Sequence, residues 1–400
     1  MTALARRGGA HVGRPSELAV LNAAKAVSNT ALRWVGPFLP TLERAFGAST
    51  GTLTGIIGAT ELGGLSTMAT GGLLDRGHER RIFLIGTAAV GVSSLIALAG
   101  SVTAFAVSFA VMLVGHANLV VAGHAWIGHR VPFAARSRAI GIFETSWAVS
   151  LLVGAPIIAL SIRWFGWRGA YGALAIGSVI GFVAVSRLVS GAPPHEPDTA
   201  SGSTRRAPPL PASAWPPIVA AAATAAAGLS IVVVSGAWLD DDHGFSTGGL
   251  GVVAAAFGAV ELVSSSSVAL VGDRVGTRRS VIAGLVVLAA GLAVMGWLGG
   301  GRGPAIVGLL VFLAGFEYGF VSSLALVTEA APRSRGRAIG IGNAVGTVAR
   351  AGAVIASGQL YEAFGIGGPV ALAGGAAAVA MIAVVVPRPA DLGTSAAAVR

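Results

Sequence analysis

Six ionisable side chains lie inside long apolar stretches of this 400-residue sequence, where an unpaired charge is costly. They are four carboxylates and two guanidinium groups: Glu61, Glu144, Glu261, Glu317, Arg33 and Arg350. A carboxylate in a partly dry cavity beside a cation can take up and release a proton. We therefore expect these residues to contact a substrate or to couple protons to its movement, with Lys25 as a further member. The alternative is that they form structural ion pairs between helices.

Two histidines and a tryptophan extend this candidate site. His116 and His124 are eight residues apart, which is about two helical turns and so roughly one face. They either contact substrate and relay protons or serve as hydrogen-bonded packing residues. Trp147, about one turn beyond Glu144, offers an aromatic wall to a substrate or packs against a neighbouring helix.

The apolar stretches themselves predict a membrane protein. The sequence is 54% hydrophobic and only 11% charged, with a mean hydropathy of +0.78, far from the composition of a soluble domain. Runs of about 20 apolar residues predict an all-α protein of twelve transmembrane helices. The expected helices are 18–40, 50–74, 81–102, 104–129, 137–162, 167–188, 215–238, 247–271, 279–299, 304–330, 337–361 and 367–387.

Internal repeats indicate that these helices form two similar halves. Arg136-Ser-Arg-Ala-Ile-Gly-Ile142 recurs as Arg335-Gly-Arg-Ala-Ile-Gly-Ile341, and the charged loop at 71–81 recurs at 271–279. Two parallel six-helix halves, related by a pseudo-two-fold axis, are a transporter architecture. The sequence predicts residues 1–190 as the first half, 191–214 as a Pro-rich tether and 215–400 as the second half.

Some of the intramembrane charges are not repeated. Glu144 corresponds to Asn343, and Arg350 corresponds to Leu151, whereas Glu61 and Glu261 match each other. Glu317 is also unmatched when the two halves are aligned. An asymmetric charge in a symmetric frame favours a functional site.

Arginine distribution predicts the orientation. Twenty arginines fall on the side of the amino terminus and four on the other, so the positive-inside rule places both termini and both charged loops in the cytoplasm. The first 16 residues are polar and basic without a cleavage site, and no signal peptide is expected. The predicted location is the inner cell membrane.

The charged loop resembles the signature that the major facilitator superfamily carries between its second and third helices, Gly-x-Leu-x-Asp-Arg-x-Gly-Arg-Arg. The matching residues are Gly71, Leu73, Asp75, Arg76 and Arg80. His78 replaces the second glycine, which the repeated loop keeps as Gly276. The resemblance covers essentially the whole chain and implies the fold of that superfamily.

Residues 138–171 resemble bacterial sugar and drug efflux permeases of the proton-antiporter type. The segments that carry the resemblance are Glu144-Thr-Ser-Trp147, Gly154-Ala-Pro156 and Gly166-Trp-Arg168. This resemblance implies export of a small organic solute in exchange for protons. The fifth helix departs from the antiporter pattern Gly-Pro-x-x-Gly-Gly, because it has Gly154-Ala-Pro-Ile-Ile-Ala159.

The Asp-Arg loops predict a cytoplasmic gate. A carboxylate is stabilised near the positive end of a helix that begins on the same side of the membrane. We expect Asp75 to meet the start of helix 11 near Arg337, and Asp273 to meet the start of helix 5 near Arg138, with Arg274 beside it. The alternative is that these loops only fix topology through their arginines.

Other functions are disfavoured. No nucleophile, metal or phosphate-loop pattern indicates an enzyme, and there is no cysteine for disulfides or thiolate ligands. The net charge of +10 is spread in small groups, which argues against nucleic-acid binding. We expect a monomer that uses no cofactor or metal and interacts with a small solute, protons and lipid. Import by symport or uniport is the alternative, and a receptor that has lost transport is disfavoured by the short tails.

The first testable prediction concerns Asp75. Because the loop is expected at the cytoplasmic mouth and not in the cavity, Asp75→Asn should slow transport without weakening substrate binding. Substrate affinity and exchange rate measured on the same purified variant check this. Transport at the wild-type rate would leave the loop with a role in topology alone.

Overall fold

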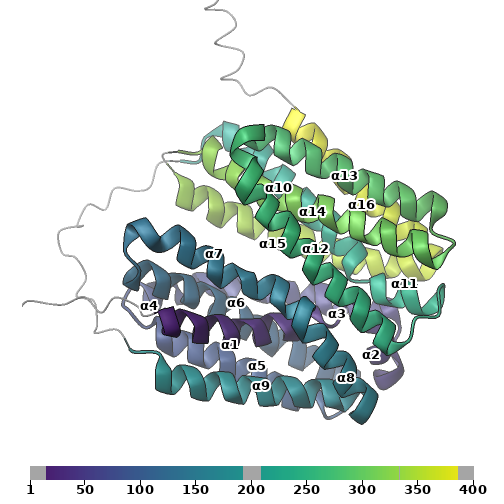
Figure 1. The fold of residues 1–400 in the computed structure, drawn as a ribbon, viewed down its shortest axis with the longest axis horizontal. Helices are drawn as coiled ribbons and strands as arrows, with labels where there is room; N and C mark the ends of the chain where they lie inside the picture. The colour runs from purple at the N-terminus through teal and green to yellow at the C-terminus, as the bar shows by residue number, and fades with distance from the viewer. Residues whose placement is uncertain (1–14, 192–208, 333, 386–400) are drawn as a thin grey trace, which may run out of the picture. The chain divides into compact units, whose positions relative to one another are not determined.

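The computed structural model describes residues 15–191, 209–332 and 334–385, and within those ranges it contains helices and no strand (Figure 1). The predicted all-α fold is confirmed. The first half contains α1 Pro15–Arg33, α2 Leu39–Phe46, α3 Thr50–Glu61, α4 Thr67–Leu74, α5 Glu79–Ala97, α6 Val102–Arg130, α7 Phe133–Val149, α8 Ala155–Phe165 and α9 Trp167–Leu188. The second contains α10 Trp215–Val232, α11 Ser235–Asp241, α12 Thr247–Val275, α13 Thr277–Leu298, α14 Arg302–Ala330, α15 Arg335–Phe364 and α16 Gly367–Val385.

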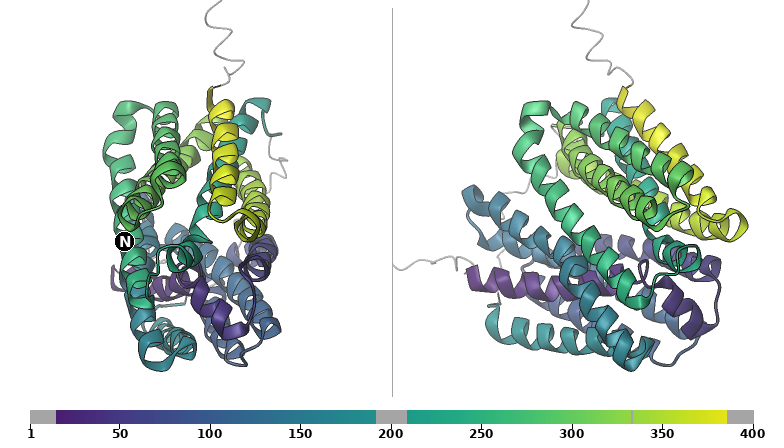
Figure 2. Two further views of the ribbon diagram at one scale, coloured as in Figure 1. Left: turned by 90° about the vertical axis from the view of Figure 1, so that its right-hand side faces the viewer. Right: turned by 45° about the vertical axis from the view of Figure 1, so that its right-hand side comes forward.

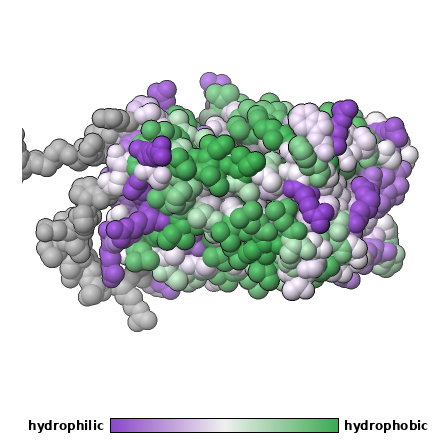
Figure 3. All heavy atoms as spheres, turned by 90° about the horizontal axis from the view of Figure 1, so that it is seen from below, coloured by the Kyte–Doolittle hydropathy of each residue, from purple (hydrophilic) through white to green (hydrophobic). Residues whose placement is uncertain are grey.

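Ten helical segments of the described ranges are long and apolar enough to cross a membrane. The remaining two of the twelve expected spans correspond to α1 and to the α3–α4 pair. Helix α1 carries Glu17, Lys25 and Arg33, and α3 and α4 are each too short alone. Figure 3 shows one face on which hydrophobic residues gather in the middle and hydrophilic residues lie toward both ends, as expected of a surface embedded in lipid.

Four of the twelve predicted helices are not continuous in the structure. The predicted 18–40 helix ends at Arg33, because Pro37 and Pro40 follow and cannot extend the backbone ladder. The predicted 215–238 helix is divided between α10 and α11.

The other two interruptions are local changes of helix type. A 3₁₀ segment, Leu62–Ser66, separates α3 from α4 and contains Gly63 and Gly64. A π-helical turn, Ser150–Gly154, separates α7 from α8 just before Pro156. Proline lacks the N–H that an α-helix needs at that position, and a wider turn accommodates it.

The chain forms two compact units. Unit 1 comprises Met1–Arg33, Gly63–Ser150 and Arg168–Ser203, and unit 2 comprises Trp34–Leu62, Leu151–Trp167 and Thr204–Arg400. Unit 2 thus contains two segments of the expected amino-terminal half in addition to the carboxy-terminal half. The division at 190 and 215 stays a prediction, and most of the expected linker, 192–208, lies outside the described residues.

Unit 1 has a core to which six of its helices contribute, Leu74 being the member from α4. Its buried residues include Leu21 of α1, Phe83 of α5, Trp126 of α6, Phe143 of α7 and Val185 of α9. Between membrane helices, such side chains stabilise the contact through van der Waals packing, because lipid tails are as apolar as the helix surfaces.

Small residues repeat at the closest helix contacts of both units. In unit 1, a Cβ on Gly86 of α5 would lie 2.6 Å from the Gly115 carbonyl of α6. In unit 2, a Cβ on Gly284 of α13 would lie 2.9 Å from the Gly315 carbonyl of α14. The same close approach in corresponding helix pairs agrees with the internal repeat, and only glycine permits it.

Unit 2 contains helices from both parts of the sequence packed together. Helix α3 lies against α15, and α8 lies against α12. A Cβ on Gly58 of α3 would lie 2.7 Å from the Ala351 carbonyl of α15, and one on Gly251 of α12 would lie 2.6 Å from the Ala159 Cβ of α8. In the same unit, α13 runs beside α14 and α16 (Figures 1 and 2).

The α3–α15 contact gives the second prediction. A Cβ on Gly358 would overlap the Thr54 hydroxyl, whereas one on Gly352 of the same helix meets nothing within 4 Å. Gly358→Ala should therefore lower stability by about 1–3 kcal/mol. Thermal unfolding in detergent measures this, with Gly352→Ala as the matched control. Equal melting temperatures for the two variants would contradict the packing.

Candidate functional site

Three polar side chains from three helices of unit 1 meet at one carboxylate oxygen. Glu144 Oε1 lies 2.8 Å from Lys25 Nζ and 2.9 Å from His124 Nε2. These residues belong to α7, α1 and α6 respectively. We call Lys25, His124 and Glu144 the polar cluster.

The ammonium group of Lys25 makes three contacts with α7. Its side chain is only 2% exposed, and Nζ also donates to the Phe143 carbonyl at 3.2 Å and lies 4.1 Å from the centre of the Phe143 ring. A buried ammonium needs such partners, because desolvation without them costs several kcal/mol. Glu144 is 47% exposed. The cationic side chain of the cluster is therefore buried, whereas its carboxylate is accessible.

His124 has an oxygen within hydrogen-bonding distance of each ring nitrogen. Its Nδ1 lies 3.0 Å from the Val120 carbonyl, which can only accept, and its Nε2 faces the Glu144 carboxylate. Both contacts are hydrogen bonds only if the ring carries two protons or if Glu144 carries one. An added proton on the His124–Glu144 pair would therefore allow both contacts to be hydrogen bonds at once.

His116 occupies the same helix two turns earlier. Its Nδ1 is 3.0 Å from the Ser28 hydroxyl of α1, and the side chain is buried. Nearby, Asn29 of α1 donates to Ser146 of α7 at 3.2 Å. These contacts continue the polar seam between α1, α6 and α7, which supports a packing role for His116 alongside the predicted one.

Arg33 and Trp147 form a second contact in unit 1. The guanidinium carbon lies 4.1 Å from the centre of the Trp147 ring, and Nη1 donates to the Trp147 carbonyl at 2.6 Å and to Ser150 Oγ at 3.2 Å. A guanidinium over an indole face gains a favourable cation–π interaction. The Trp147 ring thus stacks against Arg33, just before the π-helical turn that begins at Ser150.

In unit 2, Arg350 pairs with Glu61 as expected. Its Nε lies 3.3 Å from Glu61 Oε2, and Nη2 donates to Thr347 at 3.2 Å. The prediction that a mid-membrane carboxylate lies within reach of an arginine is confirmed. Glu317 is buried and accepts from Ser265 at 2.7 Å, and Glu261 is 2% exposed. The roles of these residues in transport stay predictions.

Comparison with known proteins identifies the family. The family model described as Major Facilitator Superfamily matches residues 21–220 and again 218–399. The chain belongs to the Major Facilitator Superfamily. The proteins of this family and the structural neighbours below are transporters and not enzymes.

Solved structures of similar fold cover nearly the whole chain. A bacterial homologue of the human lysosomal transporter Spinster, inward-facing and unoccupied, has a TM-score of 0.75 at 15% identity and covers 95% of this chain and 93% of its own. A D-xylose–proton symporter has a TM-score of 0.76 at 14% identity, covering 93% and 97%. A peptide transporter POT in complex with sulfate has 0.73 at 14%, covering 98% and 96%. At these identities the likeness shows the fold alone.

The superfamily signature loop lies at the start of α5 in unit 1. Asp75 and Arg76 are exposed at the end of α4, whose Gly71 carbonyl accepts from the Asp75 N–H at 3.0 Å. Arg80 donates to the Ser186 carbonyl of α9. Arg80 therefore fastens α5 to α9 in addition to any role in gating.

The expected gate contacts stay predictions. They would join Asp75 of unit 1 to Arg337 of unit 2, and Arg138 of unit 1 to Asp273 of unit 2. Arg138, Arg274 and Arg337 are exposed, and the side chain of Asp273 lies outside the described residues.

Sequence reasoning missed a set of contacts within unit 2 that join α2, α3, α11 and α15 near their ends. Arg44 of α2 lies 2.5 Å from Asp240 of α11, and Tyr361 of α15 donates to Asp241 at 2.9 Å. Glu362 of α15 accepts from the Gly51 N–H of α3 at 2.7 Å. We call these contacts the outer network. Their only sequence signal is the acidic run at 240–242.

A buried pair of charges in unit 1 was also missed. Glu79 is fully buried, with Arg130 Nε at 3.6 Å and His129 Nδ1 at 3.6 Å from its carboxylate. Glu79 and Arg130 lie in charged segments that the positive-inside rule had assigned to the membrane surface.

A double-mutant cycle on the polar cluster gives the third prediction. Lys25→Met and Glu144→Gln should each destabilise the protein, and the double variant should lose less than the sum. We expect a coupling of about 1 kcal/mol or more, because each single change leaves one partner of a part-buried pair. The exposed Arg44–Asp240 pair is the control and should couple by no more than about 0.5 kcal/mol. Additive losses at Lys25 and Glu144 would contradict the ion pair.

Proposed function

We propose that this protein is a secondary transporter that exports a small organic solute, sugar-like or drug-like, in exchange for protons. It works by alternating access in the inner cell membrane, with both termini in the cytoplasm. The observation that carries the proposal is the contact of His124 with Glu144 beside the buried Lys25, and we infer that this pair holds the exchanged proton.

Loss of that proton changes the forces within the polar cluster. When it leaves to water, the Nε2 lone pair of His124 faces a charged oxygen of Glu144, and the contact becomes repulsive. Lys25 still holds Glu144, so His124 and its helix must adjust. Protonation at this point therefore biases the packing of α6 against α7, which is what a coupling site must do.

A solute can take the place of the proton. An amino group, or two neighbouring hydroxyl groups, can donate two hydrogen bonds and so satisfy the lone pairs of both His124 and Glu144 after deprotonation. Proton and solute then compete for one site, which is the requirement for antiport. Because the proton gradient across the inner membrane is directed inward, such exchange drives the solute out.

Arg33 with Trp147 is the expected second contact for the solute in unit 1. The indole face and the guanidinium provide an apolar wall and a donor on the same helices as the polar cluster. Glu61 with Arg350 is the corresponding charged pair in unit 2. The protein needs no cofactor or metal for this cycle and acts as a monomer in the lipid bilayer.

Alternating access requires the outer network to break and re-form. These contacts tie α2 and α3 to α11 and α15 within unit 2. They are hydrogen bonds and surface ion pairs, each contributing about 1 kcal/mol or less, so they can open on the timescale of transport. Asp75 and Asp273 are the residues that we propose to close the cytoplasmic side.

Import by proton symport or by uniport is the alternative. The three mechanisms differ in the sign of proton movement when solute enters a vesicle. Solute-dependent changes of internal pH, screened over sugars, amino acids and amphipathic drugs in proteoliposomes, distinguish them. Antiport raises the internal pH as solute enters, symport lowers it, and uniport leaves it unchanged. A chain that moves no solute under any gradient would be a receptor.

The fourth prediction assigns the coupling carboxylate within that experiment. Glu144→Gln cannot hold the shared proton, so proton-driven accumulation should be lost while solute exchange down its own gradient continues. The same substitution at Glu61, Glu261 and Glu317 provides the comparison, and these variants should keep their proton dependence. If Glu144→Gln stays coupled, the carrier is a different residue, and the variant that loses coupling identifies it.

A further inference from the structure

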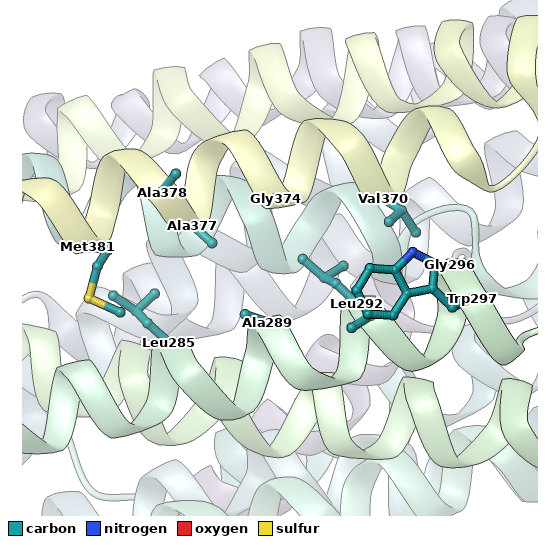
Figure 4. A pocket seen from close by; sticks show the side chains of 11 residues that line it. Leu285, Ala289, Leu292, Gly296, Trp297, Val370, Gly374, Ala377, Ala378 and Met381 are labelled. Carbon is teal, nitrogen blue, oxygen red and sulfur yellow. The ribbon is translucent and has the colours of Figure 1, made fainter.

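An apolar groove runs between α13 and α16 of unit 2. It has a volume of about 450 Å³, and its lining contains no charged residue. Leu285 and Met381 lie at one end, and Trp297 and Val370 at the other (Figure 4). Both helices are membrane spans of unit 2.

The groove exists because its walls consist of small residues. Ala289 and Gly296 of α13 face Gly374 and Ala378 of α16 across it. A Cβ on Gly374 would meet nothing within 4 Å, so the space beside this glycine is open. Ala289, Gly296 and Ala378 are exposed, and the groove is therefore open to the hydrocarbon phase along its length.

A basic residue lies beyond the Leu285 end. Arg278 is seven residues before Leu285, two turns away on the same face of α13. Its Nη2 donates to the Val385 carbonyl, four residues beyond Met381 on α16, at 2.6 Å. This bond bridges the two helices that form the groove and places the guanidinium in line with it. Arg279 is exposed beside it.

The spacing matches a phospholipid. Seven helical residues separate the guanidinium from the groove by about 10 Å, and the headgroup region of a bilayer is about 5–8 Å thick on each side. A phosphate at Arg278 would thus place the first part of an acyl chain at Leu285. One leaflet of hydrocarbon, about 15 Å, then extends along Ala289 toward Leu292.

We propose that this groove is a binding site for an anionic phospholipid, with the phosphate at Arg278 and Arg279 and one acyl chain between α13 and α16. Basic residues between spans attract anionic headgroups on the cytoplasmic side, which is the predicted side of the 271–279 loop. Trp297, 86% exposed at the far end, lies at the opposite interface. The inference does not depend on proton coupling or on the transported solute.

Lipid retention by the purified protein tests the proposal. Native mass spectrometry in detergent, with phosphatidylglycerol or phosphatidylcholine of identical acyl chains added, counts the lipids bound. The wild type should retain phosphatidylglycerol in preference to phosphatidylcholine. Arg278→Gln should weaken retention at least about fivefold, since one arginine near the membrane surface is worth about 1 kcal/mol.

Filling the groove gives an independent variant. Gly374→Leu should reduce retention of phosphatidylglycerol by a similar factor, because its side chain enters the space of the acyl chain. Gly375→Leu is the matched control, since Gly375 is the adjacent residue, also has no atom within 4 Å of its Cβ, and does not line the groove. Arg274→Gln controls for loss of a cytoplasmic-side arginine outside the groove.

Three outcomes overturn the proposal. The first is equal retention of the two lipids by the wild type. The second is retention by Gly374→Leu that equals that of Gly375→Leu. The third is a change from dimer to monomer in Gly374→Leu with lipid retention unaltered, which would assign the groove to a second copy of this chain.

Discussion

A charge within hydrocarbon must be paired, and this constraint organises the polar interior of the protein. Lys25 is almost fully buried and is tolerated because Glu144 and the Phe143 carbonyl and ring surround it. Glu144 in turn contacts His124, so one carboxylate brings α1, α6 and α7 together. The structural requirement and the proposed coupling function are therefore met by the same contact.

Irregular helix segments lie where the chain passes between its two compact units. Three of the five unit boundaries fall after Arg33, Leu62 and Ser150, at the turn before α2, the 3₁₀ segment and the π-helical turn. Backbone hydrogen bonding is weakest or rearranged at such points. Three of the helices predicted for the amino-terminal half thus have an interruption at which they can bend.

Side-chain size governs which helix pairs approach closely and which leave space. Glycines at 86 and 115, and again at 284 and 315, remove the groove between neighbouring helices by letting backbones touch. Along α13 and α16 the small residues of the two helices line an apolar groove instead. The same residue types therefore occur both at close helix contacts and along a groove.

The sequence by itself determined the all-helical membrane fold, the internal repeat and the family, because long apolar runs and repeated loops are local properties. It also selected Glu144, Arg33 and Arg350 as charges that needed partners. Tertiary structure alone decided the partners, since helix rotation brings Lys25 and His124 to Glu144 and leaves Glu317 with Ser265. It also decided the helix breaks and the outer network, which depend on contacts between residues as far apart as Arg44 and Asp240.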